Sequence, residues 1–546
     1  MAQQLYFSRD TRMFLQFRNT TDNTELAADL GKGALWEIPV LDGYSFSQTT
    51  NTSEITLAEM ESSAGISRRG RRMFTDSLAP AEWSFSTYIR PFKSLAGSVA
   101  SGVKAADSSA ETHAIEEALW ASMVGADMYT SNKFVRSVQP VSGSQTDVIA
   151  PGADSSVITI QESNRSALHS FVLYFMIETD TTNPLLYRMP EAIVNEVTVD
   201  FDVDGIATLN WSGFAKEIQD RTANVKISAG TTVAVANAHG TGSNLALGDL
   251  IVDTNNSRAV HIANTVSGTN AVLTQAIDES TTSTQNFIRN RLTSVAIEAA
   301  DQSDKVAGTF PGQSVTVTAI TEANPAVVTA AAHGFAAGDV VRVTGTCGIS
   351  KSGADVLNGV DLTIASVTTD TFTTGLNLSS GTSGSFSGTP VAANGKYSLT
   401  LTGGSFNIGN NITYLVPEEL GAINKPLEHV TGTRTATGNA TCYLTLEDTD
   451  SSNGTSRQFF NDLVGTGAMN KVVNKFKVTM AIGGTAATAN TTDPALQLIF
   501  PTAHIEVPTH SIEDVISLET NFTALPTDFG SADEITSITY FKPATY

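Results

Sequence analysis

The sequence predicts a mainly β protein built on a duplicated domain, and three observations lead to this prediction. Hydrophobic residues make up 41% of the chain and charged residues only 16%, a balance typical of short strands joined by polar turns. Apolar and polar residues alternate along most of the chain, which argues against disorder. Similar segments also recur in the same order in its front and rear parts, and such an internal repeat indicates a duplicated unit.

Three pairs of segments make up the repeat, and their order is kept while the loops between them differ in length. The pairs are Gly43-Tyr44-Ser45-Phe46 with Glu54-Ile55-Thr56-Leu57 against Gly404-Ser405-Phe406 with Asn411-Ile412-Thr413-Tyr414, the helical patterns that end at Val124-Gly125 and Val464-Gly465, and the strands 171–177 and 476–482 before Asn183-Pro184 and Asp493-Pro494. Three collinear pairs are hard to obtain by chance. A duplicated chain also favours symmetric assembly.

The repeat divides the chain into four parts. We expect a first copy at residues 1–221 and a second copy at residues 287–304 and 396–546. Residues 305–395 lie inside the second copy, in a predicted hairpin loop, where an inserted β-domain costs little folding free energy. Residues 222–286 are a β-rich linker or an extra module.

Alternation and turn residues place the elements of the first copy. We predict strands at 14–17, 35–40, 83–87, 168–178 and 194–211, a long polar excursion with little periodicity at 48–80, and one helix at 111–124 with Glu116 and Glu117 near its start.

The second copy is predicted to open with a strand at 287–292, a counterpart of the first strand, and to resume at 396–401. Strands inside the insert are expected at 314–320, 339–343, 362–367 and 371–373. Ala332-His333-Gly334 before Gly338-Asp339 resembles Ala238-His239-Gly240 before Gly248-Asp249, which suggests that residues 222–286 echo the insert.

Charge and composition exclude several classes of protein. The formal net charge of -23 argues against a surface that grips nucleic acid, would keep a subunit soluble before assembly, and would give any enclosed channel a negative wall. The longest apolar run, 171–177, is too short to span a bilayer, and the first residues have no apolar core of a secretory signal. Two cysteines indicate no disulfide framework. We therefore expect a protein of a reducing cytoplasm, unless a particle carries it out.

The first copy combines residues 36–47 (Trp-Glu-Ile-Pro-Val-Leu-Asp-Gly-Tyr-Ser-Phe-Ser), the long polar loop after them, the Trp83 strand and the late strand 196–211. In these segments it resembles the tail tube proteins of long-tailed (siphovirus-type) bacteriophages. It implies two tandem tail-tube β-sandwich domains, each flanked by a helix, in a chain that forms trimeric rings of pseudo-sixfold symmetry. Rings would stack into a hollow channel for viral DNA.

The same resemblance implies the partners and the location. They would be further copies of the chain, the tail terminator, tip and tape measure proteins, and DNA in transient, non-specific passage, with no membrane insertion. The subunit would assemble in the host cytoplasm and reside in the virion tail. The insert, through Ala332-His333-Gly334-Phe335 and Gly338-Asp339, resembles a small β-domain first named in ubiquitin-activating enzymes and common in phage structural proteins. There it would be an outer decoration without ubiquitin chemistry.

An acidic alternation supplies the main candidate site. Asp200-x-Asp202-x-Asp204-Gly205 matches the first half of a calcium-binding EF-hand loop, but the required acid at the twelfth position is Trp211 and the segment alternates as a strand through Val197, Val199, Phe201 and Val203. Asp200, Asp202 and Asp204 therefore form either an ordinary solvated face or a channel lining that repels phosphate. In the second copy the candidates are Glu513, Asp514 and Glu519.

Arg68, Arg69, Arg71 and Arg72 form a dense basic cluster in the long polar loop. Three interpretations remain open: a contact with carboxylates of the stacked ring, a contact with nucleic acid, or a solvated loop. We favour the protein contact, because the chain is acidic and no aromatic residues are interleaved. The second copy offers only Lys425 at this place.

Enzyme, cofactor and metal signatures are missing from the sequence. There is no His-Glu-x-x-His, no Gly-Lys-Ser/Thr phosphate loop and no Gly-x-Ser-x-Gly elbow. His239 and His333 precede glycines and are expected in turns, and Cys347 and Cys442 lack metal-ligand spacing. An alternative function is a surface adhesin or carbohydrate-binding tail-tip protein, which would need clustered exposed aromatics. A β-rich hydrolase lacks any nucleophile constellation.

Overall fold

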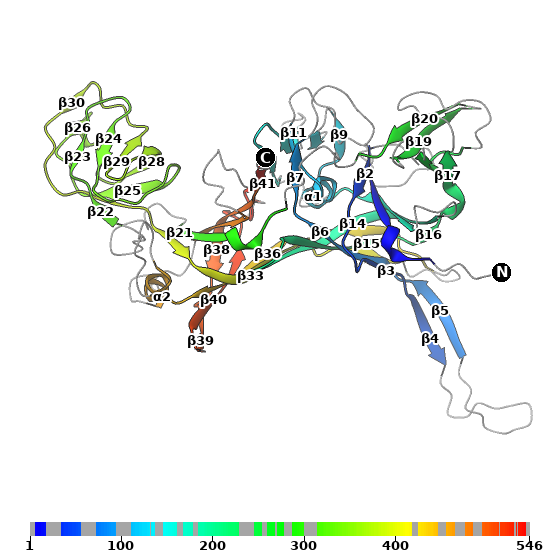
Figure 1. Cartoon of the computed structure of the whole chain (residues 1–546). Helices are drawn as coiled ribbons and strands as arrows, with labels where there is room; N and C mark the ends of the chain where they lie inside the picture. The colour runs from blue at the N-terminus through cyan, green and yellow to red at the C-terminus, as the bar shows by residue number, and fades with distance from the viewer. Residues whose placement is uncertain are drawn as a thin grey trace, which may run out of the picture. The chain divides into compact units, whose positions relative to one another are not determined.

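The computed structural model is mainly β, which confirms the predicted fold class (Figure 1). The structure describes residues 6–17, 34–55, 72–93, 111–130, 133–136, 146–160, 168–177, 184–228, 245–253, 259–267, 270–277, 287–299, 314–417, 424–445, 455–464, 476–483, 494–512, 514–528, 531 and 533–541. No helix among these residues is both long and apolar enough to cross a membrane.

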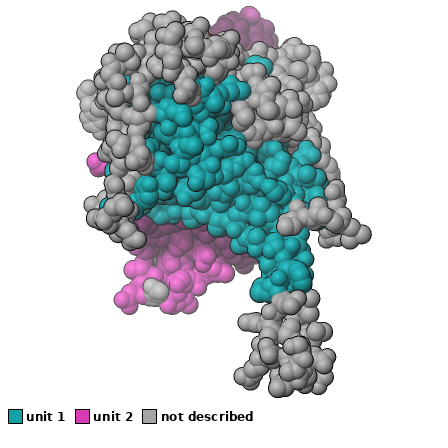
Figure 2. All heavy atoms as spheres, turned by 90° about the vertical axis from the view of Figure 1, so that its right-hand side faces the viewer, with its two compact units in different colours: residues 1–198, 208–286, 408–435 teal, residues 199–207, 287–407, 436–546 magenta. Residues whose placement is uncertain are grey.

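The chain divides into two compact units, which Figure 2 shows in different colours. Unit 1 comprises residues 1–198, 208–286 and 408–435, and unit 2 comprises residues 199–207, 287–407 and 436–546. Each unit thus takes a short segment from the other copy of the repeat. The segment 408–435 of the second copy packs within unit 1.

The core of unit 1 begins with β1 (Arg12–Phe17), which pairs antiparallel with both β2 (Ala34–Ile38) and β13 (Phe171–Ile177). β13 pairs onward with β14 (Leu185–Asp202). All residues from Met13 to Phe17 are buried. This continuous burial explains why β13 and the segment Met13–Phe17 of β1 are almost entirely apolar, because strands covered on both faces do not alternate. The exception in β1 is Gln16, whose Oε1 accepts a hydrogen bond from the Tyr174 hydroxyl at 2.9 Å.

A second group of strands has one buried and one polar face. β6 (Ala81–Tyr88) pairs with β3 (Ser45–Ser47) and with β15 (Thr208–Ala215). The indole Nε1 of Trp211 donates a hydrogen bond to Thr87 Oγ1 at 3.1 Å inside the core. The alternating burial of β6 and β15 follows the period of two that the sequence predicted at 83–87.

The prediction of one strand at 194–211 is wrong. The structure has two strands there, β14 from Leu185 and β15 from Thr208, joined by a turn that contains Gly205. Gly205 has a φ of 144°. Such a conformation is strained for residues with a side chain, so Asp204-Gly205 reverses the chain at this point.

The helix is shorter than predicted. α1 (Glu117–Val124) begins six residues later than expected, because Thr112–Ala114 form β8 and pair with β7 (Pro91–Lys93). His113 Nδ1 lies 2.9 Å from Glu117 Oε2 within the buried start of the helix. Gly125 ends the helix in a left-handed conformation with a φ of 86°.

The polar excursion at 48–80 contains structure that the sequence did not predict. β4 (Thr50–Ile55) and β5 (Arg72–Leu78) form an antiparallel hairpin that extends away from the body of unit 1 (Figure 1). Residues 56–71, between the two strands, lie outside the described residues. We call the pair β4–β5 the first arm.

Further strands complete unit 1. An antiparallel series consists of β9 (Met128–Thr130), β10 (Lys133–Arg136), β11 (Thr146–Pro151) and β12 (Ser155–Ile158). The module after residue 221 contains η4 (Thr222–Asn224), β17 (Val225–Ser228), β18 (Leu250–Asp253), β19 (Ala259–Ser267) and β20 (Asn270–Gln275) and follows the two-residue β16 (Gln219–Asp220). Leu250 and Ile262 of this module share one apolar cluster with Phe14 and Leu35.

Unit 2 repeats the strand pairing of unit 1. β21 (Ser294–Ala299) pairs with β32 (Lys396–Leu399) and β37 (Phe476–Ile482), as β1 pairs with β2 and β13. β37 pairs onward with β38 (Leu496–Ile505). The counterpart of the opening strand is therefore β21, and the strand predicted at 287–292 is wrong. Its last residues form a 3-10 turn, η5 (Asn290–Leu292).

The remaining elements of the second copy follow the same order. β36 (Thr435–Tyr443) pairs with β40 (Ile516–Ala524), as β6 pairs with β15. The others are β33 (Leu401–Gly409), β34 (Thr413–Leu415), β35 (Glu428–Val430), α2 (Ser456–Val464), β39 (Thr509–Ile512) and β41 (Ser537–Phe541). We call the described residues between 410 and 430, which include the hairpin β34–β35, the second arm.

The segment between β21 and β32 has its own sheets and core. Phe335 and Phe372 lie at the centre of an apolar cluster drawn only from residues 315–392. The strands are β22 (Ser314–Thr316), β23 (Ala319–Ile320), β24 (Val327–Thr329), β25 (Val340–Thr344), β26 (Ser350–Lys351), β27 (Ala354–Asp355), β28 (Val360–Val367), β29 (Thr371–Thr374), β30 (Thr382–Ser383) and β31 (Val391–Ala393). The strand predicted at 314–320 is thus two short strands.

The same turn occurs in the module and in the insert. Asp249 Oδ2 accepts a hydrogen bond from Ala246 N–H at 2.8 Å, and Asp339 Oδ2 accepts one from Ala336 N–H at 2.9 Å. The glycine before each aspartate has a positive φ, 84° and 92°. This shared geometry supports the suggested echo between the two segments.

Candidate functional site

The acidic alternation lies at the end of β14, on the part of the strand that belongs to unit 2. Asp200 and Asp202 are exposed, and Phe201 between them is buried at 5% exposure. Val203 does not continue this pattern, because it lies in the bend after the strand and is 47% exposed. The predicted alternation is confirmed up to Asp202 and is wrong at Val203.

Two of the three aspartates have partners in the segment 287–292. Asn290 Nδ2 donates a hydrogen bond to Asp202 Oδ1 at 3.2 Å. Asp204 Oδ1 lies 3.6 Å from Arg291 Nη1, in a pair in which both side chains are largely exposed. The strand geometry cannot wrap these carboxylates around one ion as an EF-hand loop does. Among the described residues, no three His, Cys, Asp or Glu side chains form a metal-binding group.

The second-copy candidates lie around the turn between β39 and β40. Asp514 is in the bend before β40, and Glu519 is exposed on β40, opposite Thr441 of β36. Glu513 lies outside the described residues. The structure thus brings Asp514 and Glu519 to one end of the β36–β40 sheet.

The polar face of unit 1 contains a shallow hollow that the sequence reading missed. Its volume is 270 Å³, and its lining includes Ser84, Ser86, Glu196, Thr198, Asn210 and Ser212. Short uncharged polar residues dominate this lining. The signal was present in the sequence, because these residues are the polar partners of Trp83, Phe85 and Trp211 in the period of two.

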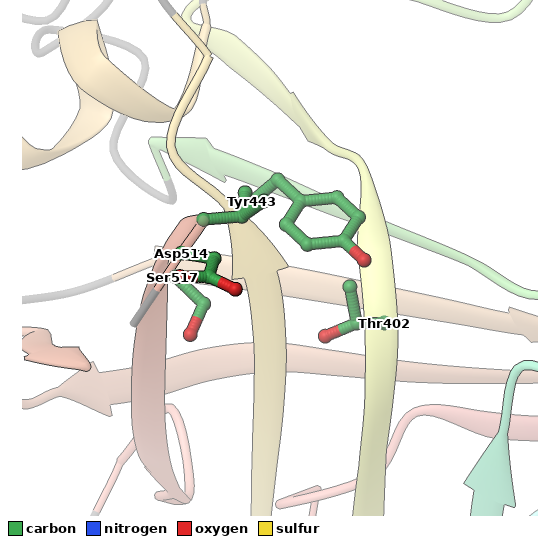
Figure 3. Close-up of a pocket in the computed structure, with 5 residues that line it drawn as sticks. Thr402, Tyr443, Asp514 and Ser517 are labelled. Atoms are coloured by element: carbon green, nitrogen blue, oxygen red, sulfur yellow. The ribbon is translucent and has the colours of Figure 1, made fainter. Parts of the chain in front are cut away.

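Unit 2 has a hollow on the corresponding strands. It measures 610 Å³ and is lined by Thr402, Tyr443, Asp514, Val515 and Ser517. In Figure 3, Asp514 and Ser517 lie on one side and Thr402 on the other, with the ring of Tyr443 beside them. β36 and β40, which carry Tyr443 and Ser517, are the counterparts of β6 and β15 in unit 1.

The second arm packs firmly within unit 1. Asn410 N–H donates to Asn195 O and Ile412 N–H to Asn195 Oδ1, both at 2.8 Å. The Tyr414 hydroxyl donates to Glu191 O. Burial, with a smaller effect of the Glu191 charge, raises the pKa of Tyr414 far above its usual value, so the hydroxyl remains a donor at neutral pH.

Apolar and charged contacts complete this packing. Ile412 and Tyr414 are 6% and 8% exposed and share an apolar cluster with Leu168 and Ile193. Lys425 Nζ lies 3.3 Å from Glu217 Oε2. The pKa of Glu217 is lowered: burial raises it, but hydrogen bonds from Gln219 and Lys425 and the nearby lysine charges outweigh burial.

Arg68, Arg69 and Arg71 lie outside the described residues. Arg72 is the first residue of β5. The contact predicted for this cluster therefore stays a prediction.

Both cysteines are buried and free. Burial raises the pKa of Cys442 to about 11 and also raises the pKa of Cys347. Cys347 additionally donates to Ile349 O at 3.6 Å. Such thiols behave as small apolar residues. All four tryptophans of the chain, Trp36, Trp83, Trp120 and Trp211, are also buried.

Comparison with known proteins gives an informative similarity. The chain is 36% identical over 141 residues to the "Tail tube protein pb6" of Escherichia phage T5. The match covers 26% of this chain and 28% of the relative, so it spans less than a third of the relative's length. No family model matches the chain. The similarity confirms the resemblance to tail tube proteins that the sequence predicted.

Proposed function

We propose that this chain is the structural subunit of a phage tail tube, in which three copies form a ring of pseudo-sixfold symmetry and rings stack into a hollow cylinder for DNA. The observation that carries the proposal is the 36% identity to a tail tube protein. The proposal assigns the chain to the virion tail. Partners of such a tube would be tail terminator, tip and tape measure proteins.

The repeated strand pairing supports the ring geometry. β1 with β2 and β13 matches β21 with β32 and β37, so one chain supplies two equivalent building blocks. Three such chains supply the six blocks of a pseudo-hexameric ring. Pairing between neighbouring blocks would also remove exposed sheet edges, which otherwise template aggregation.

The polar strand faces support the channel. We assign the lumen to the hollowed faces of β6–β15 and β36–β40 together with Asp200, Asp202, Asp204, Glu513, Asp514 and Glu519. Short polar side chains and carboxylates offer phosphate no cation to bind, and the carboxylates repel it. DNA would therefore slide along this wall without adhering.

The arginine cluster has a separate role in the proposal. Arg68, Arg69, Arg71 and Arg72 would contact carboxylates of the adjacent stacked ring, because bidentate arginine–carboxylate pairs fix orientation. The adhesin alternative has less support, because glycan-binding surfaces present aromatic rings and all four tryptophans are buried.

Electron microscopy of the purified full chain, with a mass measurement of single rings, tests the assembly. We expect tubes or stacked rings, and a ring mass of three chains. Dispersed compact particles that bind glycans would contradict the proposal. A ring of six chains would contradict the trimer but not the tube.

The lumen assignment is tested in phage that carries Asp200→Asn, Asp202→Asn and Asp204→Asn together. The control carries Thr363→Lys, Ala365→Lys and Val367→Lys on the exposed face of β28 in the insert, which changes net charge by the same amount. We expect slower DNA ejection in the first phage only. Equal ejection rates would remove the lining role of the aspartates.

A further inference from the structure

We propose that the first arm docks on unit 2 of a second copy of this chain, at the face formed by His504, Glu506, Thr523 and Leu525. The inference rests on the proposed self-assembly and names the surfaces that would join neighbouring chains. It follows from the second arm, which already makes the equivalent joint inside unit 1.

The two arms occupy equivalent positions in the repeat. The first arm follows β3 and precedes β6, and the second arm follows β33 and precedes β36. Ser45 lies opposite Ser84, and their hydroxyls are 2.8 Å apart. Ser405 N–H donates to Asn439 Oδ1 at 2.9 Å. Both arms therefore have the same place in the order of strands.

The receiving strands are also equivalent, residue by residue. Phe171 at the start of β13 lies opposite Ala192 of β14. Phe476 at the start of β37 lies opposite Ala503 of β38. Counting onward from the two alanines, His504 corresponds to Ile193 and Glu506 to Asn195.

These positions are covered in unit 1. Ile193 is fully buried, in a cluster with Ile412 and Tyr414 of the second arm, and Phe214 packs against the same cluster. Asn195 accepts a backbone hydrogen bond from the arm through its side chain. The face is thus occupied by a hairpin from the second copy of the repeat.

The corresponding face of unit 2 consists of exposed residues in the part of the chain that the structure describes. His504 and Thr523, which lie opposite each other on β38 and β40, are both exposed. Leu525, on the same side of the chain as Thr523, is 38% exposed. Glu506 occupies the position at which Asn195 accepts the arm in unit 1. Its Oε2 already accepts a hydrogen bond from Asn521 Nδ2 at 3.4 Å, and the carboxylate has room to accept a backbone N–H as well.

The first arm is correspondingly uncovered. Met73 and Phe74 of β5 are 61% and 52% exposed, although both are large apolar side chains. Near the base of the arm, Leu78 N–H donates to Asn424 O at 2.8 Å. A single chain therefore carries an exposed first arm and, in unit 2, an exposed face equivalent to the one that the second arm covers in unit 1. We infer that the first arm covers this face in another copy of the chain.

Photo-crosslinking of the full chain tests the joint. Phe74 is replaced by the photoreactive p-benzoylphenylalanine, and the products are mapped by mass spectrometry. We expect crosslinks between chains to peptides from residues 496–512 or 514–528. The same replacement at Val430, which is 47% exposed on the second arm, is the matched control and should crosslink within one chain to residues of unit 1.

The outcomes separate this inference from the proposed function. Crosslinks from position 74 to unit 1 or to the insert of another copy, in a sample that forms rings, would overturn the inference and leave the tube standing. Absence of both rings and crosslinks between chains would overturn both.

A second pair of variants checks the energetics. Met73→Asp with Phe74→Asp, or Leu525→Asp alone, should raise the protein concentration needed for assembly on the order of tenfold, because these side chains would be buried at the joint. The circular dichroism spectrum should stay unchanged. Unchanged assembly of both variants would contradict the joint.

Discussion

Tyr414 should be the main anchor of the second arm. The change Tyr414→Phe removes the hydrogen bond to Glu191 O, and one such bond contributes about 1 kcal/mol. Tyr414→Ala also removes a ring that is 8% exposed and packed against Leu168 and Ile193, for a total of about 4 kcal/mol. The loss should be local, because the arm opens before the rest of unit 1 unfolds.

Hydrogen exchange measured by mass spectrometry reads this local stability. Peptides that cover residues 410–430 should exchange about fivefold faster in Tyr414→Phe and on the order of several hundredfold faster in Tyr414→Ala. Tyr443→Phe is the matched control, because Tyr443 is 44% exposed, and it should change nothing in these peptides. If Tyr414→Ala leaves their exchange unchanged, the arm is held by other contacts and our account of its docking is wrong.

Three further predictions concern a histidine, a cysteine and a glycine. Burial lowers the pKa of His429 from 6.5, despite its contact with Leu168 O and the charge of Glu428, so the unfolded chain binds the proton more readily. The neutral His429 side chain therefore stabilises the folded arm fully above pH 6.5, and this stabilisation is lost as the pH falls through the lowered pKa. Hydrogen exchange of the second arm, corrected for intrinsic rates, should accelerate over that pH range. The acceleration should be smaller in His429→Gln. Cys442, with a pKa of about 11, should resist alkylation at pH 8 until denaturant is added, in a chain that carries Cys347→Ala; rapid labelling of the native chain would contradict its burial. Gly213→Ala should lower the melting temperature strongly, because its Cβ would lie 2.1 Å from Ile193 O and 2.4 Å from the Trp83 ring, whereas Gly43→Ala, with nothing within 4 Å, should cost only about 1 kcal/mol for its positive φ.

Some of the strands with a buried face were predicted from the sequence, whereas others, such as β11 and β12, were not. β6 and β15 alternate because Trp83, Phe85 and Trp211 point inward and serines and asparagines point outward. β13 is continuous and apolar because it is covered on both faces. In both cases burial imposes a pattern that can be read without the structure.

The first arm shows where this reading stops. β4 and β5 are held by each other's backbone, and their described side chains are largely exposed. No face is buried in the single chain, so nothing in the sequence enforces alternation. If the arm is buried only against another copy, its pattern reflects a surface that the single chain does not contain.

The candidate site was predictable only in part. The exposure of Asp200 and Asp202 follows from local alternation, which one strand is enough to define. The partners of the aspartates were not predictable, because Asn290 and Arg291 come from a distant part of the sequence. Asn290 and Asp202, for example, are separated by 88 residues. Pairing across such distances depends on topology and not on spacing.

These partners change how the proposed channel would act on DNA. Arg291 beside Asp204 reduces the negative potential at the turn, so repulsion there is weaker than three aspartates alone would give. Among the described residues that line the hollow of unit 1, Glu196 is the charged one, beside serines, threonine and asparagine. Uncharged short side chains neither attract phosphate strongly nor require counterions to be displaced. Where this hollow forms the wall, DNA would pass chiefly because the lining offers phosphate no cation to bind, with charge repulsion as a smaller, salt-dependent addition.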